Sequence, residues 1–169
     1  MDFMVMGLPR SRTQWLSNFL TNGRECFCYH ELLGDVSSLD EYRNKFELPY
    51  AKVGTAETAS MLIEKEFTCP KVVIHRDLNV VNESLLHTIG SYEFRPILEK
   101  CQRKLDKVDG IHINFDEIDD NLELIWQTCI GTPMDKLRAE NLQRMKIETN
   151  SLYPSLGGAQ LISQLIVET

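Results

Sequence analysis

The sequence predicts an α/β protein of three layers (α/β/α), in which helices cover both faces of a mostly parallel central sheet. Five apolar runs have the length of strands, and they lie near residues 3–6, 25–30, 50–53, 71–75 and 111–115. Segments with helical periodicity separate these runs, and such alternation is typical of parallel strands joined by helical crossovers. Of the 169 residues 43% are hydrophobic, which suits one core, so we expect a single domain over residues 1–169.

The first helix is predicted directly after the first strand. Trp15 and Phe19 mark its apolar face, and it ends near Gly23. The segment 34–48, after the second strand, is polar and charged with few apolar anchors. It forms either a substrate loop, since such loops are often polar, or a solvated helix over residues 37–46.

Later helices follow from the same periodicity. Segments 55–67 and 78–89 have the spacing of crossover helices, and the clearest amphipathic stripe runs from Ile118 to Cys129. Thr132 is then predicted to cap a further helix, because a proline follows it at the first helical position. A last helix is expected over residues 158–167.

The net charge of the chain limits the classes of partner that it can bind. A formal net charge of −7 and a pI near 5.1 argue against binding to nucleic acid or to an anionic membrane surface. No apolar stretch approaches the length of a membrane helix, and the first residues lack the pattern of a secretory signal. We therefore expect a cytoplasmic protein, and the sequence leaves its oligomeric state open.

The five cysteines are scattered and odd in number, which is typical of free thiols in a reducing compartment. Cys26, Cys28 and His30 alternate, so on a strand they would share one face and could resemble a metal site. The sequence offers no fourth metal ligand at a spacing that would complete such a site. We therefore favour buried thiols and expect no metal.

Residues 7–15, with the sequence Gly-Leu-Pro-Arg-Ser-Arg-Thr-Gln-Trp, carry the strongest functional pattern. A short strand, a turn marked by Gly and Pro, and a helix N-terminus together direct backbone N–H groups and the positive end of a helix dipole at one anion-sized space. Arg10 and Arg12 would add forked donors suited to phosphate or sulfate oxygens. The segment therefore predicts an anion-binding loop.

This loop differs from the common nucleotide-binding pattern Gly-x4-Gly-Lys-Ser/Thr. Counted from Gly7, Arg12 stands at the second glycine, Thr13 at the lysine and Gln14 at the hydroxyl position. The lysine that reaches the terminal phosphates and the hydroxyl that holds magnesium are thus missing. An ordinary ATPase or kinase is disfavoured.

The stretch Pro-Arg-Ser-Arg-Thr-Gln-Trp-Leu, residues 9–16, resembles the 5′-phosphosulfate loop of the sulfotransferase superfamily. The pattern of that loop is roughly Pro-Arg/Lys-Ser-Gly-Thr-Thr-Trp-Leu, and six of the eight positions agree. The resemblance implies a fold like that of the P-loop nucleoside triphosphate hydrolases. It also implies transfer of a sulfuryl group from 3′-phosphoadenosine 5′-phosphosulfate (PAPS) to a hydroxyl or amine acceptor, with no metal.

A second segment extends the resemblance. The family binds the 3′-phosphate of its donor with an Arg that ends a strand and a Ser eight residues later, and this chain has Arg76 and Ser84 after an apolar run. Ser84 falls on the flank of the predicted helix, where its hydroxyl can face a ligand; the alternative for Arg76 is a salt bridge with a neighbouring acid. Residues 113–131 also resemble the late strand and helix of the family. The Arg-Lys-Gly segment that cytosolic members use as a further clamp has no counterpart.

The donor-binding residues that the resemblance implies are Arg10, Ser11, Arg12, Thr13, Gln14, Trp15, Arg76 and Ser84. Arg10 would stabilise the charge that builds on the leaving oxygen. Arg12 replaces a family glycine, and it is either a ligand contact or a solvent-facing charge. Trp15 matches a Trp that stacks on adenine, although its spacing with Phe19 also suits a core residue.

The catalytic base is predicted at the end of the second strand. Cytosolic members carry a catalytic His after Lys-Thr, where this chain reads Lys52-Val-Gly-Thr55 without a His. His30 and Glu31 are the favoured candidates, and Glu57 is the third. Neighbouring strand residues face opposite ways, so we expect only one of His30 and Glu31 to face the site.

Two other functions stay open from the sequence. A variant P-loop nucleotide kinase or hydrolase would share the strand, loop and helix, and its nucleotide binding would depend on magnesium. A non-catalytic nucleotide- or anion-binding protein would keep the anion loop without the base.

Overall fold

The computed structural model describes residues 1–23, 25–89, 94–144 and 154–167. In these residues five strands form one parallel sheet with the order β2-β3-β1-β4-β5. The strands are β1 (Phe3–Gly7), β2 (Cys26–His30), β3 (Lys52–Glu57), β4 (Lys71–His75) and β5 (Ile111–Asn114). Each predicted apolar run contributes to a strand, so the predicted parallel sheet is confirmed.

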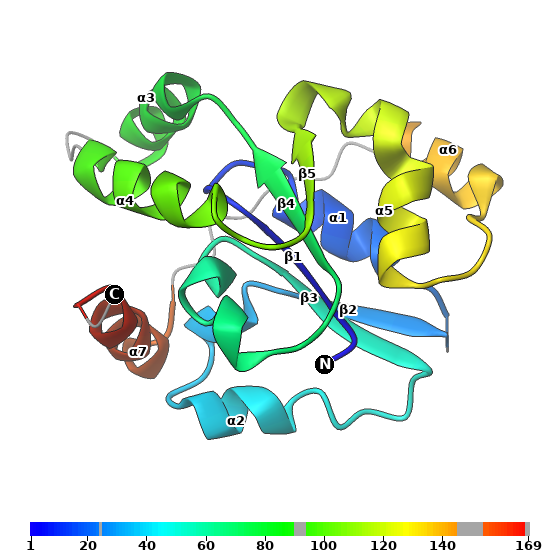
Figure 1. Cartoon of the computed structure of the whole chain (residues 1–169), viewed down its shortest axis with the longest axis horizontal. Helices are drawn as coiled ribbons and strands as arrows, with labels where there is room; N and C mark the ends of the chain where they lie inside the picture. The colour runs from blue at the N-terminus through cyan, green and yellow to red at the C-terminus, as the bar shows by residue number, and fades with distance from the viewer. Residues whose placement is uncertain (24, 90–93, 145–153, 168–169) are drawn as a thin grey trace.

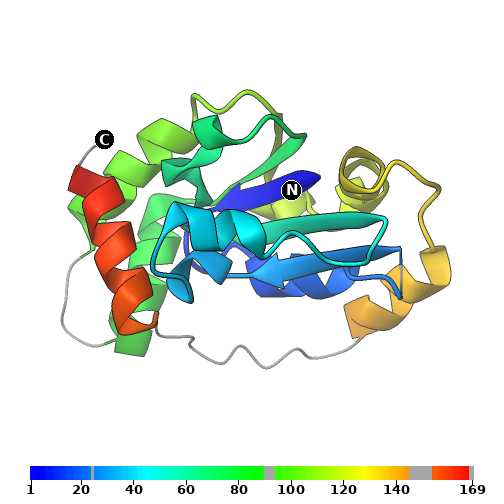
Figure 2. The same ribbon diagram turned by 90° about the horizontal axis from the view of Figure 1, so that it is seen from below.

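Helices lie against both faces of this sheet (Figures 1 and 2). They are α1 (Thr13–Leu20), α2 (Leu39–Asn44), α3 (Leu78–Ile89), α4 (Arg95–Leu105), α5 (Leu122–Cys129), α6 (Lys136–Arg144) and α7 (Leu156–Val167). Helices α1, α5 and α6 pack on one face, and α3 and α4 pack on the other. Helices α2 and α7 cover the β2–β3 side of that second face.

The central strand shows why both faces are covered. In β1, Phe3 and Val5 face the α1 side, whereas Met4 and Met6 face the α3 side, and all four are fully buried. A strand with apolar side chains on both faces must be shielded from water twice, which is typical of parallel sheets. The burial of the strand thus fixes the two helical layers.

The predicted crossover helix over residues 55–67 is wrong. Strand β3 continues through Glu57, and two short 3-10 turns follow it, η2 (Ser60–Leu62) and η3 (Glu64–Glu66). Residues of β3 pair with β1 on one side and with β2 on the other. The backbone hydrogen bonds to both neighbouring strands stabilise the strand more than the spacing of the apolar residues stabilises a helix, because that spacing is only a local preference.

Three other helices differ in detail from the expectation. Helix α2 forms within the segment for which a loop or a helix was predicted; Ser38 caps it, and its Tyr42 is fully buried rather than solvated. Helix α6 is capped by Asp135, which accepts the N–H of Arg138 at 3.0 Å, so the predicted cap at Thr132 is wrong. Helix α4, which the sequence analysis did not predict, has a proline in its first turn.

The five cysteines are free, as predicted, and Cys26, Cys28 and Cys129 are buried. Within the described ranges, no three His, Cys, Asp or Glu side chains come together as a metal site. No helix in the same ranges has the length and apolar character needed to cross a membrane.

Candidate functional site

The polar residues singled out in the sequence gather at the carboxyl edge of the sheet, beside β1 and β4. These neighbouring strands send their following helices to opposite faces: α1 packs on one side of the sheet and α3 on the other (Figure 1). The two connections diverge there, and the carboxyl edge at such a point is where open α/β sheets usually bind ligands. The loop after β1 and the Arg76 segment both lie at this edge.

The loop between β1 and α1 has an unusual backbone. Arg10 and Arg12 have left-handed φ angles of 69° and 61°, and Ser11 lies between them. Alternating handedness turns successive N–H groups toward one side, as in anion-binding backbone nests, and the first turn of α1 adds N–H groups without intrahelical partners. Among the described residues, the third non-glycine residue with positive φ is Glu31, at the same sheet edge. Clustered backbone strain of this kind is a mark of functional sites.

The Arg12 side chain packs back onto the protein. Its guanidinium lies 3.1 Å from Asp119 and 4.4 Å from the centroid of the Trp15 ring. One prediction for Arg12 was a charge that faces the solvent. The side chain is 25% exposed and forms an ion pair with Asp119, so it faces the solvent only in part. The left-handed φ also gives a physical reason for the glycine that the sulfotransferase pattern carries at this position.

The strain at Arg12 can be measured. We expect Arg12→Gly to be more stable than Arg12→Ala by about 1 kcal/mol, because both variants lose the side-chain contacts but only glycine adopts a left-handed φ freely. Urea unfolding compares the two. The matched control is Asn18, an exposed residue inside α1, where the order should reverse, with Asn18→Ala the more stable by about 1 kcal/mol. Equal stabilities of the two Arg12 variants would show that the loop is not strained.

Ser11 supplies a buried polar group at the centre of the loop. It is fully buried, and its hydroxyl has no hydrogen-bond partner among the described residues. A buried hydroxyl without a partner costs free energy, so such a group is explained well by a ligand that is bound during function. Gly7 makes this close packing possible, since a Cβ there would lie 3.0 Å from both the Ile74 carbonyl oxygen and the Ser11 Cβ.

The two segments that the sequence singled out converge. Arg10 Nε donates to Ser84 Oγ at 3.0 Å, and an Arg76 guanidinium N–H donates to the Arg10 carbonyl. Arg76 Nε is buried and has no hydrogen-bond partner among the described residues. Burial and the nearby Arg10 lower the pKa of Arg76, and Asp116 opposes this shift. The alternative prediction for Arg76 was a salt bridge with a neighbouring acidic residue. Among the described residues Arg76 forms no ion pair, so this alternative is wrong.

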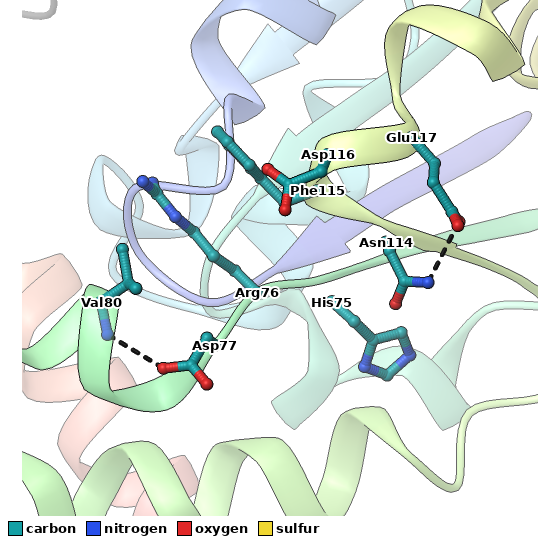
Figure 3. A pocket seen from close by; sticks show the side chains of 8 residues that line it. All are labelled: His75, Arg76, Asp77, Val80, Asn114, Phe115, Asp116 and Glu117. Carbon is teal, nitrogen blue, oxygen red and sulfur yellow. Dashed lines mark hydrogen bonds between the residues drawn. The ribbon is translucent and has the colours of Figure 1, made fainter.

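A cavity of about 450 Å³ opens beside Arg76, between the ends of β4 and β5 (Figure 3). It is lined by His75, Arg76, Asp77, Val80, Asn114, Phe115, Asp116 and Glu117. Figure 3 shows the Arg76 side chain running alongside Phe115, and the guanidinium lies 4.0 Å from the centroid of that ring. Phe115 is not among the site residues that were predicted from the sequence. Its position directly after β5 could have indicated it, because the carboxyl ends of parallel strands meet at one edge.

On the other side of the loop, His30 and Glu31 both contact Thr13. The Thr13 hydroxyl donates to Glu31 Oε1 at 3.2 Å and lies 3.3 Å from His30 Nε2. The expectation that only one of the two residues faces the loop is wrong. Glu31 leaves the strand with a φ of 52°, so the alternation of strand side chains no longer applies to it.

The environments of these two groups shift their protonation in opposite directions. Burial lowers the pKa of His30 to about 4, so the imidazole is neutral near pH 7. Burial and then the charge of Glu57 raise the pKa of Glu31 to about 7, against the donors Thr58 and Thr13. A carboxylate with such a pKa, 23% exposed and next to the loop after β1, is suited to accept a proton.

Glu57 does not fit the role of the third candidate base. It is fully buried, and its carboxylate accepts hydrogen bonds from the Tyr42 hydroxyl at 2.6 Å, the Leu33 N–H at 3.0 Å and the Thr55 hydroxyl. A substrate cannot reach a carboxylate that is enclosed in this way.

Trp15 takes the core alternative rather than the adenine-stacking role. It is only 8% exposed, its ring stacks on Phe19 with centroids 5.3 Å apart, and its N–H donates to the Leu142 carbonyl at 3.3 Å. The Arg12 guanidinium lies against the same ring. Gln14 is the second residue of α1 and is half-buried.

No protein-family model matches the chain, and a search of curated proteins finds no match. The function of the site is therefore inferred from its geometry. The fold and the site define an α/β protein with a strained, donor-rich loop at the carboxyl edge of a parallel sheet.

Proposed function

We propose that this protein transfers a sulfuryl group from PAPS to a hydroxyl or amine acceptor, on a fold of the P-loop type. The observation that carries the proposal is the convergence of Arg76 and Ser84 on the strained loop at Arg10. Two adjoining groups of hydrogen-bond donors are suited to a ligand that carries two separate negatively charged groups. A nucleotide with a 5′-phosphosulfate and a 3′-phosphate has this property.

We assign each part of the donor to one group of residues. The N–H groups from Arg10 to Gln14 and the unpartnered Ser11 hydroxyl would hold the 5′-phosphosulfate. Arg76, with its unpartnered Nε, and Ser84 would hold the 3′-phosphate. The cavity lined by Arg76 and Phe115 would then take the nucleoside. The acceptor then approaches from the Glu31 side of the loop.

The chemistry follows from this placement. Glu31 takes the proton of the acceptor as the acceptor oxygen or nitrogen attacks sulfur in line with the leaving group. A bond forms from the acceptor to sulfur, and the bond from sulfur to the bridging phosphate oxygen breaks with its electron pair. Arg10 and the loop N–H groups stabilise the negative charge on that oxygen. The products are the sulfated acceptor and adenosine 3′,5′-bisphosphate.

Calorimetry with adenosine 3′,5′-bisphosphate tests the proposal. We expect the bisphosphate to bind equally well in EDTA and in magnesium, and to bind about tenfold or more tightly than adenosine 5′-monophosphate, which lacks the 3′-phosphate. Failure to bind the bisphosphate would reject the proposal. Magnesium-dependent binding of ATP would favour a variant kinase, and bisphosphate binding without turnover of PAPS over a broad acceptor panel would indicate a non-catalytic protein.

A further inference from the structure

Two carboxylates lie side by side where β2 and β3 end, and each accepts hydrogen bonds from the turn that follows the other strand. The pairing of His30 with Ala56 brings the two strand ends together. Both oxygens of Glu31 lie 3.1 Å from the N–H of Thr58, the residue after β3. In return, Glu57 accepts the N–H of Leu33, in the 3-10 turn η1 (Leu32–Gly34) after β2. The two turns are therefore linked through their carboxylates.

Glu57 is the more enclosed member of this pair. One of its oxygens accepts the hydroxyls of Tyr42 and Thr55, and the other accepts the Leu33 N–H, so three donors satisfy one fully buried carboxylate. Burial of a charged group is costly unless hydrogen bonds compensate it. The proposed transfer does not use the Glu57 carboxylate directly, so the free-energy cost of burying it needs another explanation.

We propose that Glu57 is a positioning residue for Glu31: it anchors the turn after β2 through the Leu33 N–H and thereby fixes the Glu31 carboxylate against Thr13. The inference rests on the proposed function, in which Glu31 is the base. Leu33 lies two residues beyond Glu31, and Glu31 has a strained φ of 52° that the surrounding bonds must maintain. Without the anchor, the turn would relax and the carboxylate would leave Thr13.

Glu57 also acts on Glu31 through charge. The ionisable groups that face Glu31 are Glu57 and His30, and those that face Glu57 include Asp35 and Tyr42. After burial, the Glu57 charge is the main cause that raises the pKa of Glu31 to about 7. Removing that charge while keeping the shape of the side chain should therefore make Glu31 more acidic.

Two variants separate the anchor from the charge. In Glu57→Gln the amide oxygen still accepts the Leu33 N–H, so we expect the Glu31 titration midpoint, followed by carbon-13 NMR of its carboxyl, to fall by about one pH unit. Glu57→Ala removes the anchor as well, and we expect kcat to fall by about 10- to 100-fold. The matched control is Glu47→Gln, at an exposed position in the same half of the chain, which should change neither readout.

An unchanged kcat in Glu57→Ala would overturn the inference. If Glu57→Ala fails to fold, Leu33→Pro removes the anchoring N–H and leaves the Glu57 charge in place, and an unchanged kcat in that variant would overturn it as well. An unchanged Glu31 midpoint in Glu57→Gln would overturn the charge effect alone. The proposed function fails separately. If Glu57→Gln moves the Glu31 midpoint while Glu31→Gln leaves the transfer rate unchanged, Glu57 acts on Glu31 but Glu31 is not the base.

Discussion

Replacing Glu31 with Gln is expected to lower kcat for sulfuryl transfer by roughly 10²- to 10⁴-fold, the usual contribution of a general base. The Gln side chain has nearly the same shape and keeps an oxygen for the Thr58 N–H, so the strand end should retain its structure. It cannot accept the proton of the acceptor. The measurement is the initial rate with PAPS at saturating acceptor, together with the affinity for adenosine 3′,5′-bisphosphate, which should not change.

The pH dependence of the wild-type rate identifies which group acts as the base. The pKa of Glu31 is raised to about 7, so its proton-accepting form accumulates as pH rises, and kcat should increase with a midpoint near pH 7. His30, with its pKa lowered to about 4, stays in one form over this range and cannot produce that rise. A midpoint near 4 that is lost in His30→Gln but kept in Glu31→Gln would assign the base to His30 instead.

Urea unfolding over a range of pH compares the stability of the wild type with that of the Glu31→Gln variant. The pKa of Glu31 in the folded protein lies above its usual value, so the folded state holds the proton more tightly than the unfolded chain. The stability that this group contributes is therefore present at low pH and lost as pH rises toward 7. Relative to Glu31→Gln, the wild type should lose stability between pH 5 and pH 8, as urea unfolding would show.

The sequence predicted the sheet and the meeting of its two key segments because both depend on robust patterns. Apolar runs of strand length place β1 and β4, and the helical period of the segment after β4 gives α3 its observed bounds. Once strands are parallel, the residues after them share one edge. The family resemblance implied that Arg76 and the Arg10 loop bind one donor, and the pairing of β1 with β4 brings the two segments into contact.

Features that depend on particular backbone angles or on pairing from both sides could not be predicted. The left-handed φ of Glu31 brings its carboxylate beside His30 at Thr13, contrary to strand alternation. Strand β3 extends through Glu57 because neighbours on both sides supply ladder bonds, although the local spacing favours a helix. The position of Phe115 directly after β5 indicates the sheet edge, but no local pattern encodes its contact with Arg76, which follows β4.

Replacing Arg76 with Met is expected to weaken the binding of adenosine 3′,5′-bisphosphate by about 10- to 100-fold, because hydrogen bonds to a charged phosphate contribute about 1.5–3 kcal/mol each. Methionine keeps a long apolar side chain against Phe115 but removes every donor. Ser84→Ala should weaken the same binding by less, because a neutral hydroxyl is the weaker donor. Calorimetry of each variant measures both effects. Arg43→Met, at an exposed arginine of α2, is the matched control and should leave the affinity unchanged.

The comparison with adenosine 5′-monophosphate separates two roles that Arg76 could have. Arg76 donates to the Arg10 carbonyl, so its removal could also disturb the loop that would hold the 5′ group. If Arg76 binds the 3′-phosphate, Arg76→Met weakens the bisphosphate but leaves the affinity for the monophosphate nearly unchanged, since the monophosphate lacks that group. If Arg76 only supports the loop, both ligands lose affinity by the same factor. The ratio of the two affinities therefore decides whether the convergence of Arg76 on the loop forms one nucleotide site.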